Sequence, residues 1–211
     1  MSDLWSLVLS SPQRLTYGSE ALVDPPPKRT FARSPHVVLV LDDFYTTDYQ
    51  ERIDAIENGA LFPYTQDLDL YKCPSGVRGE TRTYVINNAM NGNTDRCPWS
   101  PPEDVSWNIK KTTQIRQPAT RFVFVDQGRI GPEGWVTCYG QPSWWDWVPV
   151  RHGKGTTFSF ADGHCEYWKW KDPRTLTHSW RNLLGDPYQP GNPDLHRVQK
   201  AMWGELGYSP E

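Results

Sequence analysis

Apolar and polar residues alternate most regularly in the second half of the chain, in two runs that flank an Asp-Gly pair. Residues 156–160 and 164–170 mix threonine, aromatic and small side chains with polar ones, a pattern typical of β-strands. Asp162 and Gly163 favour a two-residue type I′ turn, because both positions of that turn need a positive φ. The pattern therefore predicts one β-hairpin.

A two-residue turn fixes which residues face each other across this hairpin. Phe160 is expected to pair with Cys165. Phe158 is expected to pair with Tyr167, so that all four side chains share one apolar face that packs on the core. The other face is then mostly polar and carries Thr157, Ser159, His164 and Glu166.

Other apolar runs predict further strands. The continuous run 37–41 is typical of a central strand covered on both faces. Residues 121–125 are bounded by proline and glycine and indicate a buried strand. Residues 67–73 and 80–88 also read as strands, and 134–139 are a further candidate.

Two segments have apolar residues at helical spacing. The first, 48–58, has Thr47 or Asp48 available as an N-cap and is followed by Gly59 as a stop. The second begins at Asn192, which is followed by a proline and an acidic residue, as in many helix starts. Its apolar stripe is expected to dock on the domain and contains Leu195, Val198, Met202 and Leu206.

These elements predict an α+β fold, with an antiparallel sheet, long loops and a C-terminal helix. A length of 211 residues suits one domain, and 19 Pro, 16 Gly and 11 Trp indicate a loop-rich protein studded with aromatic residues. We assign residues 36–211 to a single globular domain. Residues 1–35 read as an N-terminal arm or connector.

Charge and hydropathy exclude two kinds of partner. The formal net charge is −3, without blocks of like charge, so the basic surface that nucleic-acid binding needs is missing. No apolar run approaches the about 20 residues of a membrane span. We therefore expect neither a nucleic-acid partner nor membrane contact by this chain.

A longer motif includes the hairpin. His152 precedes Asp162-Gly163 by nine intervening residues, and this spacing resembles the H-X9-DG signature of prepilin-type, processing-associated proteins, a pseudopilin-like family of bacterial envelopes. Segments from about residue 50 to 205 resemble successive motifs of that family in the same order. They are residues 61–64, 70–75, 83–87, 118–126 and 192–195.

The resemblance implies a pseudopilin-like fold and a non-catalytic protein of the cell envelope, periplasmic or on the extracellular surface. Such a protein belongs to a type IV pilus-like filament, a type II secretion apparatus or a surface-recognition system, and its partners are other pseudopilin-like subunits or apparatus proteins. Family members begin with a basic leader and a long apolar helix, neither of which this sequence contains. Either that helix precedes the chain in the native protein, or the protein never had one, which would argue against filament assembly.

The cysteines are even in number and include no C-x-x-C pair, which disfavours a zinc ribbon or a thioredoxin-type site. The export implied by the resemblance would permit disulfides. We expect a bridge from Cys73 to Cys97, which the chain-entropy model values at about 3–4 kcal/mol, with unrelated thiols as the alternative. A bridge from Cys138 to Cys165 is a second candidate, unless Cys165 rests in the core as a buried thiol.

We expect His152, Asp162 and Gly163 to have structural roles. Asp162 should accept backbone hydrogen bonds within its turn, Gly163 should supply a positive φ, and a ring nitrogen of His152 should hold the preceding loop. Calcium is the competing hypothesis, because the resemblance implies an ion near a C-terminal loop and Asp126 or Asp162 offers oxygens. Calcium needs six to eight of them.

Two alternative functions follow from other residues. A tryptophan cluster would form a platform for sugar rings or for a protein partner if exposed, and would close the sheet end if buried; it comprises Trp144, Trp145 and Trp147. A metal-dependent hydrolase would use ligands of suitable type, although no spacing makes them converge: Asp126, His152, Asp162 and His164. No nucleophile elbow, H-E-x-x-H or phosphate-binding motif is present, so we expect a protein that is not an enzyme.

Overall fold

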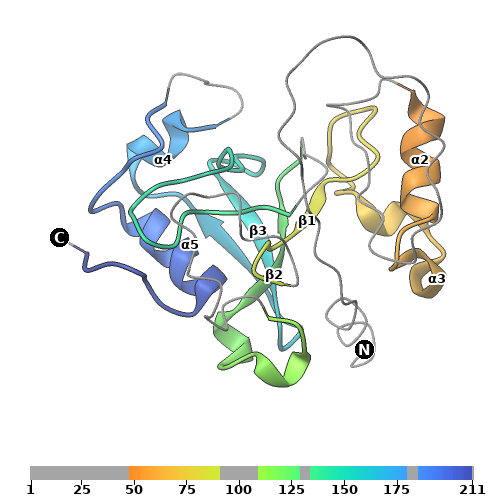
Figure 1. The fold of residues 1–211 in the computed structure, drawn as a ribbon. Coiled ribbons are helices and arrows are strands. Elements are labelled where there is room, and N and C mark those ends of the chain that lie inside the picture. Colours follow the sequence, from red (N-terminus) through yellow and green to blue (C-terminus); the bar gives the residue numbers. More distant parts are fainter. Residues whose placement is uncertain (1–47, 91–108, 129–133, 180–184, 211) are drawn as a thin grey trace, which may run out of the picture.

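The computed structural model describes residues 48–90, 109–128, 134–179 and 185–210. Its centre is a four-stranded antiparallel sheet in the order β1-β2-β3-β4 (Figure 1). The strands are β1 (Tyr84–Ile86), β2 (Phe122–Asp126), β3 (Gly155–Phe160) and β4 (Cys165–Lys169). This sheet and the helices around it confirm the α+β class. The strand expected at 37–41 and the arm at 1–35 lie outside the described residues.

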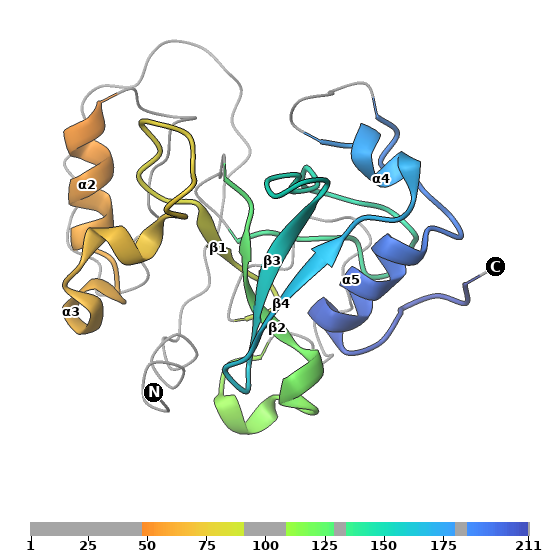
Figure 2. The same ribbon diagram turned by 180° about the vertical axis from the view of Figure 1, so that it is seen from behind.

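Helices lie on both sides of the sheet. Figures 1 and 2 place α2 (Tyr49–Glu57) and α3 (Phe62–Thr65) at one side of the molecule, and α4 (Pro173–Thr177) and α5 (Pro193–Trp203) at the other. The helix expected at 48–58 is confirmed as α2. The carboxylate of its N-cap, Asp48, accepts hydrogen bonds from the next backbone N–H groups.

The main core lies between the sheet and α5 and is rich in aromatic side chains. Val85, Val125 and Phe158, from neighbouring strands, are at most 1 % exposed. The predicted stripe of α5 packs against them, with Leu195, Val198 and Met202 fully buried. Leu206 lies beyond the end of the helix, because Gly204 adopts a left-handed φ of 94° and stops it.

The hairpin forms, but its predicted register is wrong by one residue. Ser159, not Phe160, pairs with Cys165, and Phe158 pairs with Glu166. Gly163 has a φ of 95° and its N–H donates to the carbonyl of Phe160, which gives a three-residue loop with a type I turn and a left-handed glycine. Asp-Gly suits this loop as well as a type I′ turn, so the dipeptide alone did not decide the register.

The shift exchanges the two faces of β4. Trp168 and Trp170 point into the core and are 3 % and 4 % exposed, whereas Cys165 and Tyr167 lie on the open face. Burying two indole rings in place of a thiol and a phenol removes far more apolar surface from water. The predicted core face Phe158, Phe160, Cys165 and Tyr167 is therefore correct only for its two phenylalanines.

Two other strand predictions are wrong. Residues 67–73 contain a 3₁₀ helix, η1 (Leu68–Tyr71), because the side chain of Asp67 accepts a hydrogen bond from the N–H of Asp69 and turns the chain locally. Residues 134–139 form isolated bridges, including Asn87 with Trp135, rather than a strand. Two more 3₁₀ helices, η2 (Thr112–Gln114) and η3 (Pro118–Thr120), precede β2.

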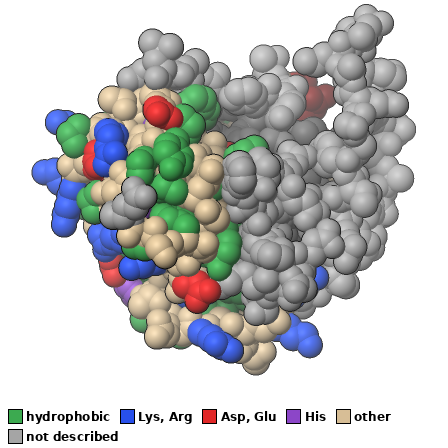
Figure 3. All heavy atoms as spheres, turned by 60° about the vertical axis from the view of Figure 1, so that its left-hand side comes forward, with side chains coloured by type: hydrophobic (Ala, Val, Ile, Leu, Met, Phe, Trp, Pro, Cys, Tyr) green, Lys and Arg blue, Asp and Glu red, His purple; other side chains and the backbone are tan. Residues whose placement is uncertain are grey.

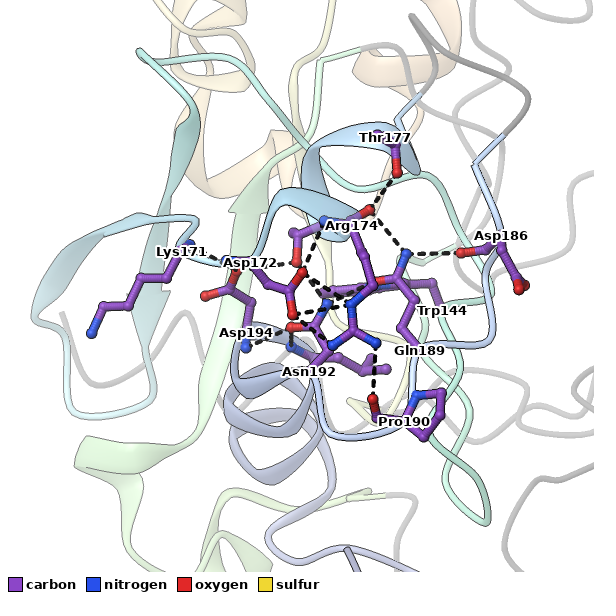
Figure 4. A network of polar contacts seen from close by, with 12 residues as sticks. Trp144, Lys171, Asp172, Arg174, Thr177, Asp186, Gln189, Pro190, Asn192 and Asp194 are labelled. Atoms are coloured by element: carbon purple, nitrogen blue, oxygen red, sulfur yellow. Dashed lines mark hydrogen bonds and ion pairs between the residues drawn. The ribbon is translucent and has the colours of Figure 1, made fainter. Parts of the chain in front are cut away.

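A buried polar network ties α4 to the start of α5 (Figure 4). Asp194 accepts hydrogen bonds from the backbone N–H groups of Lys171 and Asp172 and from the hydroxyl of Thr175. Asn192 caps α5, since its side-chain oxygen accepts from the first N–H groups of the helix. The Asn-Pro-Asp sequence thus both starts the helix, as predicted, and anchors it to the preceding segment.

The other end of α5 is held by an arginine next to β2. Arg121 is 6 % exposed, and its guanidinium donates to the carbonyls of Ala201 and Met202. Burial lowers the pKa of Arg121 to about 10, so the group remains a cation at neutral pH. A cation at the C-terminal carbonyls interacts favourably with the helix dipole.

Candidate functional site

The candidate site lies at the open end of the hairpin, where three segments far apart in the sequence meet. Asp126 is the last residue of β2, His152 belongs to the loop before β3, and Cys73 follows η1. The loop around His152 is held tightly, since the N–H groups of Arg151 and His152 both donate to the carbonyl of Gly155. These bonds keep the imidazole at the end of β2.

His152 is the central member of this group. Its Nε2 lies 2.7 Å from Oδ2 of Asp126 and 3.8 Å from Sγ of Cys73. Because a carboxylate can only accept, Nε2–H donates to Asp126. The Asp126 side chain is 1 % exposed and that of His152 is 31 % exposed, so the group is buried on one side and reachable from the other.

A second carboxylate and an arginine stand behind Asp126. Arg151 forms a fork with Glu80, with Nη–Oε distances of 2.9 and 2.7 Å, and its Nε lies 3.6 Å from Oδ1 of Asp126. Burial acts to lower the pKa of Arg151, but the hydrogen bonds and charge of Glu80 outweigh it and raise the pKa. Oδ1 of Asp126 is buried and has no hydrogen-bond partner among the described residues.

The thiol of Cys73 is positioned by its own loop. Its backbone N–H donates to the hydroxyl of Thr83, and its Sγ lies 3.2 Å from Oγ of Ser75. Tyr84 is close as well: burial, followed by the negative charges of Cys73 and Asp126, raises the pKa of its hydroxyl. The site therefore combines a thiol, an imidazole, a carboxylate and a phenol at one edge of the sheet.

The positions of Cys73, Asp126 and His152 argue against a catalytic relay and are compatible with metal binding. A Cys-His-Asp relay needs the acid on one ring nitrogen and the thiol on the other. Here both Asp126 and Cys73 approach Nε2 of His152, so that relay is not assembled. The same three side chains do converge as metal donors, because one atom of each lies within 4.8 Å of the others.

The turn end of the hairpin holds a second histidine with carboxylates. Asp162 accepts hydrogen bonds from the N–H of His164 and from its Nδ1, at 3.2 and 2.5 Å, as expected for a residue that stabilises its own turn. Nε2 of His164 lies 3.2 Å from Glu166. The bond to Asp162, followed by that to Glu166, raises the pKa of His164, and the bond from His164 lowers the pKa of Asp162.

The four candidate ligands of a metal-dependent hydrolase lie at two separate places in the structure. Asp126 and His152 lie at one end of β3, whereas Asp162 and His164 lie at the other, about 20 Å away for a six-residue strand. The four-residue hydrolase set is therefore not brought together, and Asp126 and Asp162 do not share an ion. Sequence reasoning missed Cys73 as a neighbour of His152, because 79 positions separate the two.

The structure bears differently on the two predicted disulfides. Cys73, Cys138 and Cys165 form no disulfide with one another in the part of the chain that the structure describes, and Cys97 lies outside it. The bridge from Cys138 to Cys165 is wrong, because the shifted register turns Cys165 outward while Cys138 is 1 % exposed.

The tryptophan cluster does not form one platform. Trp144 is 1 % exposed and donates through Nε1 to Gln189, Trp147 is half-buried, and Trp145 is 46 % exposed. A bridge between Ser143 and Tyr188 brings a second exposed aromatic residue to this segment. On the side of α4 and α5, hydrophobic side chains lie open among uncharged ones, with Lys and Arg along one edge (Figure 3).

Comparisons of the chain with models of protein families, with curated proteins and with solved structures found no match. The likeness to the H-X9-DG family thus rests on the motifs quoted above. Within the described part of the chain, no helix has both the length and the apolar character needed to cross a bilayer.

Proposed function

We propose that this chain is the globular part of a pseudopilin-like protein of the cell envelope, which acts by contact with other subunits and not by catalysis. The observation that carries the proposal is the use of the signature residues. His152 holds the end of β2 through Asp126, while Asp162 and Gly163 make the hairpin turn. All three positions serve the fold.

The fold class is compatible with this role. An antiparallel sheet with a helix packed on its core face is the kind of architecture that the resemblance implies. The thiol, imidazole and carboxylate at the open end are not arranged as a nucleophile with its base. A binding or assembly module accounts for both observations.

The surface around Trp145 is the best place for a partner. Trp145 and Tyr188 are 46 % and 52 % exposed and belong to segments joined by one bridge. Aromatic residues are enriched in protein interfaces relative to the rest of the surface, and exposed aromatic side chains that lie together mark candidate interfaces. We assign this surface to contact with a neighbouring subunit.

Cross-linking in cells tests the proposal with the protein expressed from its native gene. A photo-reactive residue replaces Trp145 in one variant and Leu70, which is 60 % exposed on η1, in the control. We expect the protein in the envelope fraction, and cross-linked products from position 145 that are absent at position 70. A protein found only in the cytosol, without products at either position, would contradict the proposal.

A second candidate, carbohydrate binding, is favoured by the exposure of Trp145 alone. Titration with a glycan panel, followed by tryptophan fluorescence, tests it. A change that is lost in Trp145→Ala but kept in Trp147→Ala would support a sugar site. No change with any glycan would remove this candidate.

A further inference from the structure

Cys73, Asp126 and His152 at the open end of the hairpin fit a transition-metal ion of the zinc class better than they fit calcium or a catalytic relay. In a tetrahedral zinc site, bonds of about 2.0–2.3 Å place nitrogen and oxygen donors about 3.3 Å apart and nitrogen and sulfur about 3.6 Å apart. The observed distances from Nε2 of His152 are 2.7 Å to Asp126 and 3.8 Å to Cys73. These two distances differ from the tetrahedral values by about 0.6 and 0.2 Å, and Sγ of Cys73 lies within 4.8 Å of the Asp126 carboxylate.

We propose that Cys73, Asp126 and His152 bind a divalent transition-metal ion of the zinc class through Sγ, a carboxylate oxygen and Nε2. Thiolate and imidazole are ligands for zinc and similar ions, whereas calcium and magnesium take oxygen ligands. The ion is thus of a different class from the calcium expected from the resemblance.

An independent observation supports this site. Asp126 is 1 % exposed, and its Oδ1 has no hydrogen-bond partner among the described residues, although Nε of Arg151 is 3.6 Å away. A buried carboxylate oxygen that makes no hydrogen bond is costly, because it has lost its contact with water, and the 3.6 Å ion pair with Arg151 compensates this loss only in part. A metal ion at this place would compensate that loss.

The charges around the site also favour a divalent cation. The carboxylates of Asp126 and Glu80 face the guanidinium of Arg151. Binding of a divalent ion through Sγ would release the thiol proton of Cys73, so the ion would be held by a thiolate and a carboxylate. These two negative charges match a divalent ion in a place where unpaired charge is expensive.

The ion would tie three segments together. It would join the loop after η1, the end of β2 and the loop before β3. Asp126 and Cys73 are 26 and 79 positions away from His152 in the sequence. Three protein ligands leave a fourth position for water, and the 31 % exposure of His152 provides the approach. The site uses His152 and Asp126, whose contact also supports the assembly proposal, but none of its donors lies on the surface of Trp145 and Tyr188 that was assigned to the partner.

Cobalt(II) is the probe for the test, used on the reduced, metal-free chain and then displaced by zinc. We expect one equivalent of Co²⁺ to give a sulfur-to-cobalt charge-transfer band and the visible bands of a tetrahedral site, both removed by one equivalent of Zn²⁺. Cys73→Ser should abolish the charge-transfer band. It should also weaken zinc binding by at least about 100-fold, more than the loss of an outer-shell partner does.

Matched variants guard against misfolding. Cys165→Ser removes an exposed thiol on β4 and His164→Ala removes the histidine of the turn, and both should bind cobalt as the parent does. Asp126→Asn keeps the shape of the side chain and should weaken zinc at least about 10-fold. No cobalt band in the parent, an unchanged band in Cys73→Ser, or binding that depends on His164 would overturn the proposal.

The native state of Cys73 gives a final check. The protein is isolated from its own cells without reductant, its thiols are mapped by mass spectrometry, and its zinc is measured. Free Cys73 with about one bound zinc supports the site. A disulfide at Cys73, such as the bridge expected to Cys97, overturns it as a native site without affecting the assembly proposal.

Discussion

The two ends of β3 carry the same pair of groups, an imidazole and a carboxylate, in opposite surroundings. At the open end, Asp126 is 1 % exposed and its partner His152 comes from 26 positions away. At the turn end, the side chains of Asp162 and His164 are 36 % and 38 % exposed and stand two positions apart. The first pair joins separate segments in a water-poor place, and the second reinforces a local turn.

This difference teaches that burial, more than pairing, decides what such a contact does. A solvated pair contributes little, because water screens it and can replace either partner. A buried pair leaves an uncompensated charge when one partner is removed. We therefore expect substitutions at the open end to have large effects on stability, and equivalent substitutions at the turn to have small ones.

The largest effect should follow Glu80→Ala. It leaves the guanidinium of Arg151, whose side chain is 6 % exposed, without its fork, and the free energy of unfolding should fall by about 3–5 kcal/mol. Urea denaturation measures this change. The double variant Glu80→Leu with Arg151→Met removes both charges of the fork and should recover part of the loss, because Asp126 then lacks the nearby guanidinium. If Glu80→Ala lowers the free energy of unfolding by less than about 1 kcal/mol, the ion pair at the open end behaves like a solvated one, and the contrast between the two ends fails.

A pair of glycine substitutions compares the ends through the backbone. Gly128 and Gly163 have φ values of 85° and 95°, so alanine at either site carries the about 1–2 kcal/mol cost of the left-handed region. At Gly163 the new methyl meets nothing, whereas at Gly128 it overlaps the guanidinium of Arg151. Thermal unfolding should show a clearly larger drop for Gly128→Ala. Equal drops would mean that Arg151 moves aside freely.

The turn end should show itself through pH more than through stability. The pKa of His164 is raised by its bonds to Asp162 and Glu166, so its contribution is complete below the ordinary histidine pKa of about 6.5. The contribution disappears as the pH rises through the raised value. NMR titration of the imidazole should show a pKa above 6.5 that falls in Asp162→Asn. An unchanged pKa in that variant would contradict the pairing.

The smallest effect is expected for Cys165→Ser, which tests the register. In the observed pairing with Ser159 the thiol is exposed, so the substitution should change the free energy of unfolding by no more than about 0.5 kcal/mol. A large loss would instead mean that Cys165 packs in the core. Chemical denaturation of both proteins decides between the two registers.

Local chemistry explains what the sequence made predictable. Asp48, Asn192 and the Asp-Gly pair act on backbone groups a few residues away, and both helices and the hairpin were found from them. The register was not, because Asp-Gly fits two loop lengths and the burial of Trp168 decides between them. Only packing across the whole sheet holds that information.

The site shows the same limit. His152 and Asp126 were both named in the hydrolase set, but that set also contained Asp162 and His164, which lie at the other end of β3. Cys73 lies 79 positions before its neighbour His152, and Glu80 lies 71 positions before its partner Arg151. Such contacts follow from the order of the strands, which no local pattern contains.

The arginine before β2 has a consequence for folding during synthesis. Arg121 is buried next to the sheet, and its acceptors are the carbonyls of Ala201 and Met202 in the last turn of α5, about 80 positions later in the sequence. While α5 is still inside the ribosome, the guanidinium of Arg121 lacks these acceptors. The free-energy cost of burying it is then too high for the sheet to close around it. The sheet therefore completes its packing only after α5 has left the exit tunnel of the ribosome.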